Sequence, residues 1–273
     1  MSKTIVITGA TSGIGKATAL LLAQQGHTLW LLNRSSTKTD ELIAEIRQTA
    51  PSAQLHFVQL DLTRLSTVYS AAERLLQLDR IDVLINNAGG LTAKREVTAD
   101  GFETQFQMNH LGHFALTTAL LPLLEKSKAR ILNVSSEAHR AGRIDFNDLQ
   151  SEKNYSSFQM YANVKLMNAL FTRELHKRYS SRGIKAFAVH PGVVNTRFGD
   201  GLGKNRWMWK LMSPFLITPE KGAATSVFLA TADVDALSGN YFKNAKLHHF
   251  AKAARSDASA ASLWEQSEKL LSH

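Results

Sequence analysis

The amino-acid sequence predicts an α/β protein with a doubly wound, mainly parallel seven-stranded sheet and helices on both faces. Short runs rich in β-forming residues alternate with longer stretches whose apolar residues recur at helical spacing. Short strands flanked by apolar helices are typical of a parallel sheet that is covered on both faces. No repeat, low-complexity tract or Pro/Gly/Ser-rich linker interrupts the 273 residues, so we expect one domain covering residues 1–273.

The individual elements follow from this alternation. In chain order, the predicted strands are TIVIT (4–8), TLWLL (28–32), QLHFVQ (54–59), VLI (83–85), RILNV (130–134), KAFAV (185–189) and GNYF (239–242). The predicted helices, which are longer and have an apolar helical period, cover 16–25, 39–49, 65–76, 102–124, 159–179 and 220–230. Because helices separate the strands, successive strands are expected to run parallel.

The composition excludes several classes of protein. The chain has no cysteine, which excludes disulfides, thiolate catalysis and cysteine-based metal sites. It has no run of about 18 apolar residues that would predict a transmembrane helix. The first residues, MSKTIVITGA, lack the pattern of a signal peptide. We therefore expect a cytoplasmic protein.

The net charge of +9 results from 32 Lys and Arg against 23 Asp and Glu. Such an excess is typical of proteins that bind nucleic acid or an acidic membrane surface. Basic and acidic residues are mixed along most of the chain, however, so we expect no nucleic-acid binding, and an anionic cofactor would use part of the charge. His139 and His190 form no cluster with Asp or Glu, and no metal site is expected.

A glycine-rich turn, TGATSGIG (8–15), follows the first predicted strand and opens the first predicted helix. Its glycines, Gly9, Gly13 and Gly15, do not follow the G-x-G-x-x-G spacing of the commoner dinucleotide fingerprint. Glycine still permits a tight turn, and the N–H groups at the helix start can bind a pyrophosphate. The alternative is a plain connection between a strand and a helix.

The second predicted strand ends in LLNRSS, where NAD-binding proteins usually place an acidic residue for the ribose hydroxyl. Arg34 stands there instead, and a guanidinium can pair with the 2′-phosphate of NADP(H). NADP(H) is therefore the preferred cofactor, with NAD(H) left open. The alternative is that Arg34 is a solvated charge at the start of a helix.

Tyr161 and Lys165 lie one helical turn apart in MYANVKLMNALF and project from the same face. A phenol with a pKa near ~10 exchanges protons poorly at neutral pH, and a neighbouring ammonium lowers that pKa. Together with the glycine-rich turn and the pair Ser135–Ser136, this spacing predicts a nicotinamide-dependent carbonyl/alcohol enzyme.

Seven motifs occur in order along nearly the whole chain: TGATSGIG, Asp61-Leu62, NNAG (86–89), Asn109, VSS (134–136), Tyr161-x-x-x-Lys165 and HPGVVNT (190–196). This set resembles the short-chain dehydrogenase/reductase family, which implies a dinucleotide-binding oxidoreductase domain of Rossmann type. More narrowly, MNHLGHF (108–114), NVSSEAHRAGRIDFNDLQSEK (133–153) and LFTREL (170–175) resemble its retinol-dehydrogenase-like branch.

The resemblance implies a catalytic role for four residues. Tyr161 would be the general acid in carbonyl reduction and the general base in alcohol oxidation. Lys165 would lower the pKa of Tyr161 and hold the nicotinamide ribose. Ser136 would hydrogen-bond the substrate oxygen, and Asn109 would support a water that links Lys165 to solvent.

The resemblance also implies a set of cofactor contacts besides Gly9, Gly15, Arg34, Tyr161 and Lys165. Implied are Thr11, Ser12, Gly13 and Ile14 at the pyrophosphate, Asp61 and Leu62 at the adenine, Asn87, Ala88 and Gly89 at the adenosine ribose, and Pro191, Gly192, Val194 and Thr196 at the carboxamide. Many NADP-preferring relatives place a basic residue just before the second glycine of the turn. Here that residue is Ser12, so the preference for NADP(H) depends on Arg34.

Two segments are expected to shape the substrate site. The polar segment 142–158, between Ser136 and Tyr161, would extend one wall of a cleft. A lid around 197–217 would then cover the substrate with an apolar cluster made of Trp207, Met208, Trp209, Leu211, Met212 and Phe215. The same cluster, beside Lys204, Arg206 and Lys210, also suits a subunit contact or a peripheral membrane contact.

The function expected from these features is an NADP(H)-dependent oxidoreductase that interconverts a small apolar aldehyde or ketone and its alcohol. A homo-oligomer is left open. One alternative is a non-catalytic nucleotide-binding sensor or scaffold, which would not need Ser136, Tyr161 and Lys165 together. Reduction of a C=C bond, as in the related protochlorophyllide reductases, is disfavoured because the chain lacks the cysteine that those relatives use.

Overall fold

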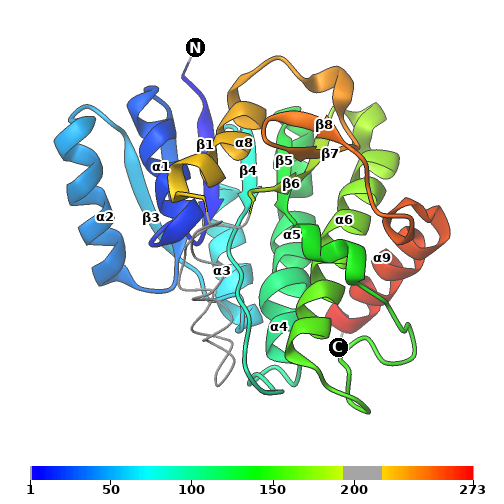
Figure 1. Cartoon of the computed structure of the whole chain (residues 1–273). Helices are drawn as coiled ribbons and strands as arrows, with labels where there is room; N and C mark the ends of the chain where they lie inside the picture. Colours follow the sequence, from blue (N-terminus) through cyan, green and yellow to red (C-terminus); the bar gives the residue numbers. More distant parts are fainter. Residues whose placement is uncertain (1, 193–216, 273) are drawn as a thin grey trace.

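The computed structural model describes residues 2–192 and 217–272, and Figure 1 shows their arrangement. Besides short 3₁₀ turns, the elements in chain order are β1 (Thr4–Thr8), α1 (Gly13–Gln24), β2 (Thr28–Asn33), α2 (Ser36–Thr49), β3 (Leu55–Gln59), α3 (Leu65–Leu75), β4 (Val83–Asn86), α4 (Thr104–Phe106), the π-helical turn η1 (Gln107–Leu111), α5 (Gly112–Lys126), β5 (Arg130–Val134), the 3₁₀ turn η2 (Glu137–Ala141), α6 (Ser157–Tyr179), β6 (Lys185–His190), α8 (Pro219–Thr231), β7 (Tyr241–Lys243), β8 (Lys246–His248) and α9 (Asp257–Leu271). The expected lid, apart from Ile217, lies outside the described residues.

The strands form a single sheet in the order β3-β2-β1-β4-β5-β6-β7-β8. All neighbours pair in parallel except β7 and β8, which are antiparallel. The strand order reverses between β1 and β4, where Ile5 lies opposite Leu29 on β2 and Val83 on β4. This topology confirms the predicted doubly wound, mainly parallel fold.

The predicted count of seven strands is wrong, because the sheet has an eighth strand, β8. β7 and β8 are joined by the two residues Asn244 and Ala245, which both have positive φ (52° and 55°). Such a hairpin turn usually carries glycine at its second position, where this chain has Ala245, so the pair was not recognised as a hairpin turn. β8 itself has three residues, all exposed, which is too short for a recognisable alternation.

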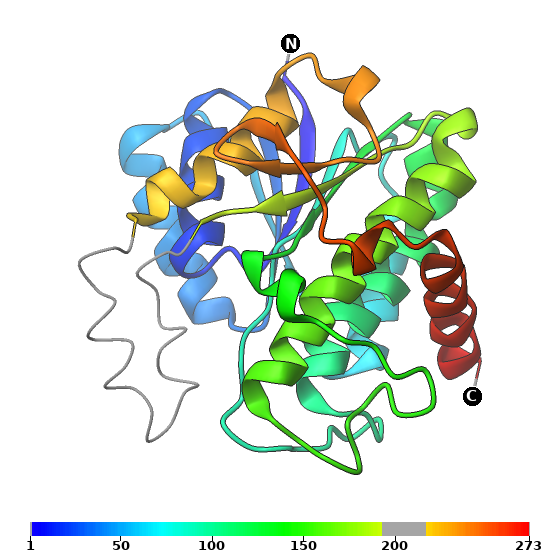
Figure 2. The same cartoon turned by 45° about the vertical axis from the view of Figure 1, so that its right-hand side comes forward.

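Helices cover both faces of the sheet, as predicted. On one face, α1, α2 and α8 surround a buried cluster that includes Leu22, Leu42 and Leu229. On the other face lie α3, α5 and α6, and α9 packs against the outer side of α6 (Figure 2). The sheet is thus buried between two helical layers.

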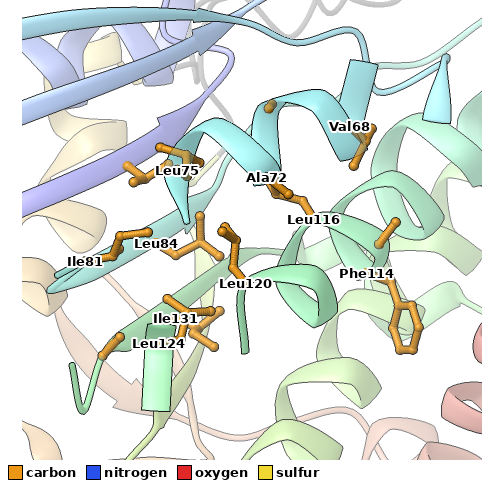
Figure 3. Close-up of a cluster of buried hydrophobic side chains, with 14 of the residues drawn as sticks. Val68, Ala72, Leu75, Ile81, Leu84, Phe114, Leu116, Leu120, Leu124 and Ile131 are labelled. Carbon is orange, nitrogen blue, oxygen red and sulfur yellow. The ribbon is translucent and has the colours of Figure 1, made fainter. Parts of the chain in front are cut away.

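The cluster between α3, α5 and the sheet holds this second layer in place (Figure 3). Val68 and Leu75 of α3 meet Leu116 and Leu120 of α5 above Leu84 of β4, and each of these side chains is fully buried. Burying one such side chain contributes roughly 1.5–3 kcal/mol relative to leaving it exposed. This packing fixes the helix α5, which directly follows the π-helical turn η1.

Two helical predictions need correction. The predicted helix 102–124 is interrupted, because α4 and α5 are joined by the π-helical turn η1. The helix α9 was not predicted at all. Ser256 caps its N-terminus by accepting from Ser259 N (3.1 Å), and Trp264 packs edge-on against Phe114, with ring centroids 4.9 Å apart.

Candidate active site

Most of the predicted site residues that the structure describes lie at one edge of the sheet. β1, β4, β5 and β6 run parallel, so their carboxyl ends meet there. Gly9 follows β1, Asn87 follows β4, Ser136 lies two residues beyond β5, and Pro191 follows β6. The point where the strand order reverses, between β1 and β4, lies in the middle of this edge.

The glycine-rich turn packs against the segment after β4. Gly9 has a φ of +70°, and a Cβ at this position would lie 2.8 Å from Ala88 Cα. A Cβ on Gly15 would collide with Gly9 O and with the side-chain amide of Asn87. Glycine is therefore required at both positions for the tight turn and the close approach of the two chains.

Asn87 and Ala88 hold the turn in place. Asn87 Nδ2 donates to Thr8 O (2.8 Å) and Gly9 O (3.2 Å). Thr8 Oγ1 in turn accepts from Asn87 N (3.0 Å) and Ala88 N (2.9 Å). The side-chain amide of Asn87 is thus committed to the turn.

The helix α1 begins at this turn and leaves its first N–H groups available. Ser12 is its N-cap, yet no side-chain hydrogen bond caps the helix, and the first turn contains no acidic residue. Gly13, with a φ of +52°, directs the chain into the helix. Free backbone donors and the positive end of a helix dipole form a site suited to a pyrophosphate.

Asn33 is a structural residue that the sequence reasoning did not single out. It is 2 % exposed, its Oδ1 accepts from Ala10 N (2.7 Å), and its Nδ2 donates to Thr39 Oγ1 (3.1 Å). The next residue, Arg34, is exposed and forms no ion pair with any residue that the structure describes. The end of β2 therefore presents a single solvated cation beside the turn.

Ser136, Tyr161 and Lys165 lie next to one another. Tyr161 and Ser136 are hydrogen-bonded, and Lys165 Nζ lies 5.4 Å from the centre of the Tyr161 ring. Ser136 Oγ also accepts from Ala138 N (3.2 Å), which caps the turn η2. The serine hydroxyl and the phenol therefore share one small polar site.

The electrostatics of Tyr161 differ from the expectation. Burial raises the pKa of Tyr161 to about 12, and the hydrogen bond with Ser136 lowers it by less. Burial also lowers the pKa of Lys165 to about 8. The expected lowering of the tyrosine pKa by the lysine is therefore not the net result, because removal of both groups from water disfavours their charged forms.

Lys165 is 4 % exposed and anchored to β5. Its Nζ donates to Val134 O (3.2 Å), which also accepts from Asn168 Nδ2 (3.1 Å). Ser135 Oγ donates to Lys165 O (2.7 Å), so the first serine of the pair fastens α6 to the sheet. These contacts hold both the ammonium and the backbone of Lys165, and they leave the second serine, Ser136, for the site.

Asn109 lies in the π-helical turn η1 and is completely buried. Its Nδ2 donates to Gly90 O (3.0 Å) and Gln105 O (2.9 Å), and its Oδ1 accepts from Gly90 N (3.2 Å). Gly89 lies between Asn109 and Lys165, since a Cβ there would collide with Asn109 Oδ1 and lie 3.4 Å from Lys165 Nζ. Gly89 therefore brings Asn109 close to Lys165.

The remaining predicted cofactor residues differ in their surroundings. Asp61 Oδ1 accepts from Thr63 N (3.0 Å), whereas the Leu62 side chain is buried in the core. Pro191 is buried, and Gly192 has a φ of +89°. Val194 and Thr196 lie outside the described residues.

Both predicted lone histidines bind the backbone near Ser136. His139 Nδ1 donates to Ser136 O (2.7 Å), and its Nε2 accepts from Ala251 N (3.0 Å). His190 Nδ1 accepts from Glu137 N (3.2 Å), and burial lowers the pKa of His190 to about 4. Within residues 2–192 and 217–272, no three His, Asp or Glu side chains are grouped to hold a metal ion.

The polar segment 142–158 lies against the segment 92–105. Tyr155 OH donates to Glu103 Oε1 (3.1 Å) and accepts from Gln105 Nε2 (2.8 Å). Ser157 Oγ donates to Thr92 O (2.5 Å). The segment is therefore fastened at the start of α6, four residues before Tyr161.

A doubly wound sheet with a glycine-rich turn at its switch point, and a Ser–Tyr–Lys set beside it, defines an NAD(P)-dependent oxidoreductase. Residues 3–207 match the family model described as short chain dehydrogenase. The protein belongs to the short-chain dehydrogenase/reductase family, as the motifs predicted. None of the helices in the described ranges is long and apolar enough to span a bilayer.

Named relatives agree with the predicted branch. The chain is 43 % identical over 272 residues to retinol dehydrogenase 12 of Homo sapiens, covering 98 % of this chain and 86 % of that protein. A solved structure of a putative uncharacterized protein from Mycobacterium paratuberculosis is 33 % identical (TM-score 0.81) and covers 99 % and 93 % of the two chains. A short-chain dehydrogenase from Sphingobium yanoikuyae in complex with NADPH is 26 % identical (TM-score 0.68), with 82 % of each chain covered.

Proposed function

We propose that this protein is an NADP(H)-dependent oxidoreductase that interconverts a hydrophobic aldehyde or ketone and its alcohol, with Tyr161 as the general acid and base. The observation that carries the proposal is the hydrogen bond between Ser136 and Tyr161 beside the buried Lys165. A hydroxyl pair of this kind can bind one oxygen atom and exchange a proton with it.

The roles of the residues follow from their contacts. The nicotinamide, when bound, supplies or accepts the hydride. Ser136 Oγ accepts from Ala138 N, so its proton is available to donate; it bonds Tyr161 in this structure and would donate to the substrate oxygen when substrate binds. Tyr161 donates its proton to that oxygen in reduction and removes it in oxidation. Lys165, as an ammonium below a pH of about 8, favours the phenolate that results.

The preference for NADP(H) rests on Arg34. It is exposed at the end of β2, has no carboxylate partner among the described residues, and stands beside the turn fixed by Asn33. A guanidinium in this position fits a 2′-phosphate. The NADPH complex of the Sphingobium relative supports the same cofactor. NAD(H) is the second candidate, because Ser12 adds no positive charge to the turn.

The substrate class rests on the relatives. Their names, retinol dehydrogenases 11, 12 and 14, indicate an apolar alcohol as substrate for those proteins. We propose that the substrate of this protein belongs to the same chemical class. The apolar lid expected from the sequence does not contribute to this argument, since it lies mostly outside the described residues. A cytoplasmic location, a homo-oligomer and peripheral membrane contact are also proposals.

Turnover by a Tyr161→Phe variant tests the function. Purified protein is assayed with NADPH and NADH against a panel of apolar aldehydes and ketones. We expect wild-type turnover with NADPH and a loss of at least about a hundredfold in the variant, since general acid catalysis contributes roughly 10²–10⁴-fold. Tyr179→Phe, at the far end of α6, is the matched control and should retain turnover. Nucleotide binding without any turnover in the wild type would favour the sensor or scaffold instead.

A further inference from the structure

One buried histidine of α5 lies between the glycine-rich turn and the catalytic set. His113 is 2 % exposed. Its Nε2 lies 2.9 Å from Thr8 Oγ1, and its Nδ1 lies 3.3 Å from Asn109 O. A single imidazole thus joins the end of β1 to the π-helical turn η1.

The hydrogen-bond partners determine the tautomer of this ring. A carbonyl only accepts, so His113 Nδ1 carries the proton and donates to Asn109 O. Thr8 Oγ1 accepts from Asn87 N and Ala88 N, and its one proton can go to Ile85 O, 3.4 Å away, or to His113 Nε2, 2.9 Å away. The unprotonated Nε2 is the nearer acceptor, so we assign the proton to it. Burial lowers the pKa of His113 to about 3, which keeps the ring neutral as this arrangement requires.

The two partners of His113 hold opposite ends of one short segment, residues 87–90. Thr8 holds its first two N–H groups, as described above. Asn109 holds its last residue, since its side-chain amide bonds both the N–H and the carbonyl of Gly90. The imidazole connects these two sets of hydrogen bonds, which would otherwise be independent of each other.

This segment faces both functional parts of the site. Ala88 packs against Gly9 of the glycine-rich turn, and Gly89 lies against Lys165 Nζ. A displacement of residues 87–90 would therefore alter the nucleotide turn and the lysine together.

We propose that His113 is a positioning residue that couples nucleotide binding at the glycine-rich turn to proton transfer at Lys165, by fixing residues 87–90 from both ends. This inference rests on the proposed function. It gives a role to the second histidine of the motif MNHLGHF, which the catalytic set leaves unexplained.

The matched control is the other histidine of the same motif. His110 is also fully buried, but its hydrogen bonds go to Ser267 Oγ on α9 (3.0 Å from Nε2) and to Asn168 on α6, and none of those that the structure describes joins it to Thr8 or to residues 87–90. His113→Phe and His110→Phe each remove one buried imidazole and keep an aromatic ring. We expect the affinity for NADPH and kcat to fall about tenfold each in His113→Phe, the effect of one lost buried hydrogen bond, and to stay within about twofold in His110→Phe.

Two further variants separate the two hydrogen bonds. The amide of Gln reaches the place of His113 Nε2, so His113→Gln keeps an acceptor for Thr8. The amide of Asn reaches the place of Nδ1, so His113→Asn keeps a donor for Asn109. We expect His113→Gln to retain NADPH affinity and lose kcat, and His113→Asn to show the opposite. Since each variant retains one bond, this pair carries the test if His113→Phe does not fold.

The measurements are NADPH fluorescence titration, kcat at saturating cofactor, and hydrogen exchange of the backbone amides in residues 87–90. Faster exchange of these amides in His113→Phe than in His110→Phe supports the proposal. Equal effects of the two substitutions on all three measurements would overturn it. If the wild type binds NADPH but shows no turnover, the proposed function fails, while the titration and the exchange rates still decide the role of His113.

Discussion

Lys243 Nζ donates a hydrogen bond to Glu137 Oε2 over 3.0 Å and so joins β7 to the turn that follows Ser136. Arg140 donates to the same carboxylate from within that turn. Because Glu137 directly follows Ser136, this ion cluster holds the backbone that carries the serine hydroxyl. The Lys243 and Glu137 side chains are 33 % and 35 % exposed, which limits their contribution to stability.

Lys243→Met should therefore impair catalysis more than stability. We expect the free energy of unfolding to fall by roughly 0–1 kcal/mol, as for a partly exposed ion pair. Misplacement of Ser136 should lower kcat/KM by about tenfold. Urea denaturation and steady-state kinetics check this, with Lys246→Met on the neighbouring strand as the control. Equal kinetics in the two variants would contradict the positioning role.

The stability contribution of Glu137 should depend on pH. Burial alone would raise its pKa, but hydrogen bonds from Arg140 and Lys243 outweigh burial and lower the pKa of Glu137 to about 2, from an ordinary value of 4.5. The contribution is then fully present above pH 4.5 and is lost as the pH falls toward about 2. Glu137→Gln should have a lower urea midpoint than the wild type at about pH 7, and the difference should shrink at about pH 3.5. A difference that does not change with pH would show that the carboxylate charge is not involved.

Arg34→Ala should change the cofactor preference. We expect the Kd for NADPH to rise by about tenfold to a hundredfold, the loss of one charge-assisted contact, and the Kd for NADH to stay within about twofold. Fluorescence titration with both nucleotides measures this. Lys177→Ala, which removes an equal charge from the end of α6, controls for net charge. Parallel losses for NADPH and NADH would rule out a contact with the 2′-phosphate.

Asn33→Leu should loosen the glycine-rich turn. It leaves Ala10 N without its buried acceptor, at a cost of roughly 1–3 kcal/mol in the free energy of unfolding. NADPH affinity should fall as well, because Ala10 belongs to the turn. Thr39→Val removes the second contact of Asn33, together with the bond from Thr39 Oγ1 to Ser35 O, but leaves the bond to Ala10 N, and it should retain NADPH affinity. Calorimetry and nucleotide titration separate the two, and an Asn33→Leu protein with wild-type Tm and Kd would refute this role.

Lys165→Met should stabilise the protein and abolish turnover. The lysine is buried with its pKa lowered to about 8, so its ammonium opposes folding at neutral pH. Val134 O keeps a donor in the variant, since Asn168 also bonds it. The gain in Tm should be largest below pH 8 and shrink as the pH rises from 8 toward 10.5, because the unfolded lysine then loses its proton too. A lower Tm than the wild type at neutral pH would contradict this expectation.

The motifs predicted which residues lie close together, because the fold brings them to the same edge of the sheet. Once the strands are parallel, the residues after β1, β4, β5 and β6 must meet at one edge, so motif order along the chain becomes proximity in space. The spacing of Tyr161 and Lys165 placed both on one face of α6, as observed. Burial could not be read from spacing. The neighbouring lysine was expected to lower the pKa of Tyr161, whereas desolvation by distant parts of the chain dominates and raises it.

The features that were missed depend on contacts far apart in sequence. The turn η1 inserts a wider turn into an otherwise regular apolar period, and it is held by Asn109 binding Gly90, 19 residues away. The helix α9 is fastened by Trp264, which packs against Phe114 and Phe171. A local sequence pattern cannot predict contacts with residues so far away in the chain.

The strand β8 also affects how the protein meets its own copies. An edge strand exposes unpaired backbone groups on which a neighbouring molecule could extend the sheet. Here the described sheet ends on a strand of three residues that carries Lys246, with Leu247 as its one exposed large apolar side chain. An edge strand that is so short and carries a lysine disfavours strand pairing with a neighbouring molecule, and so disfavours aggregation through this edge of the sheet.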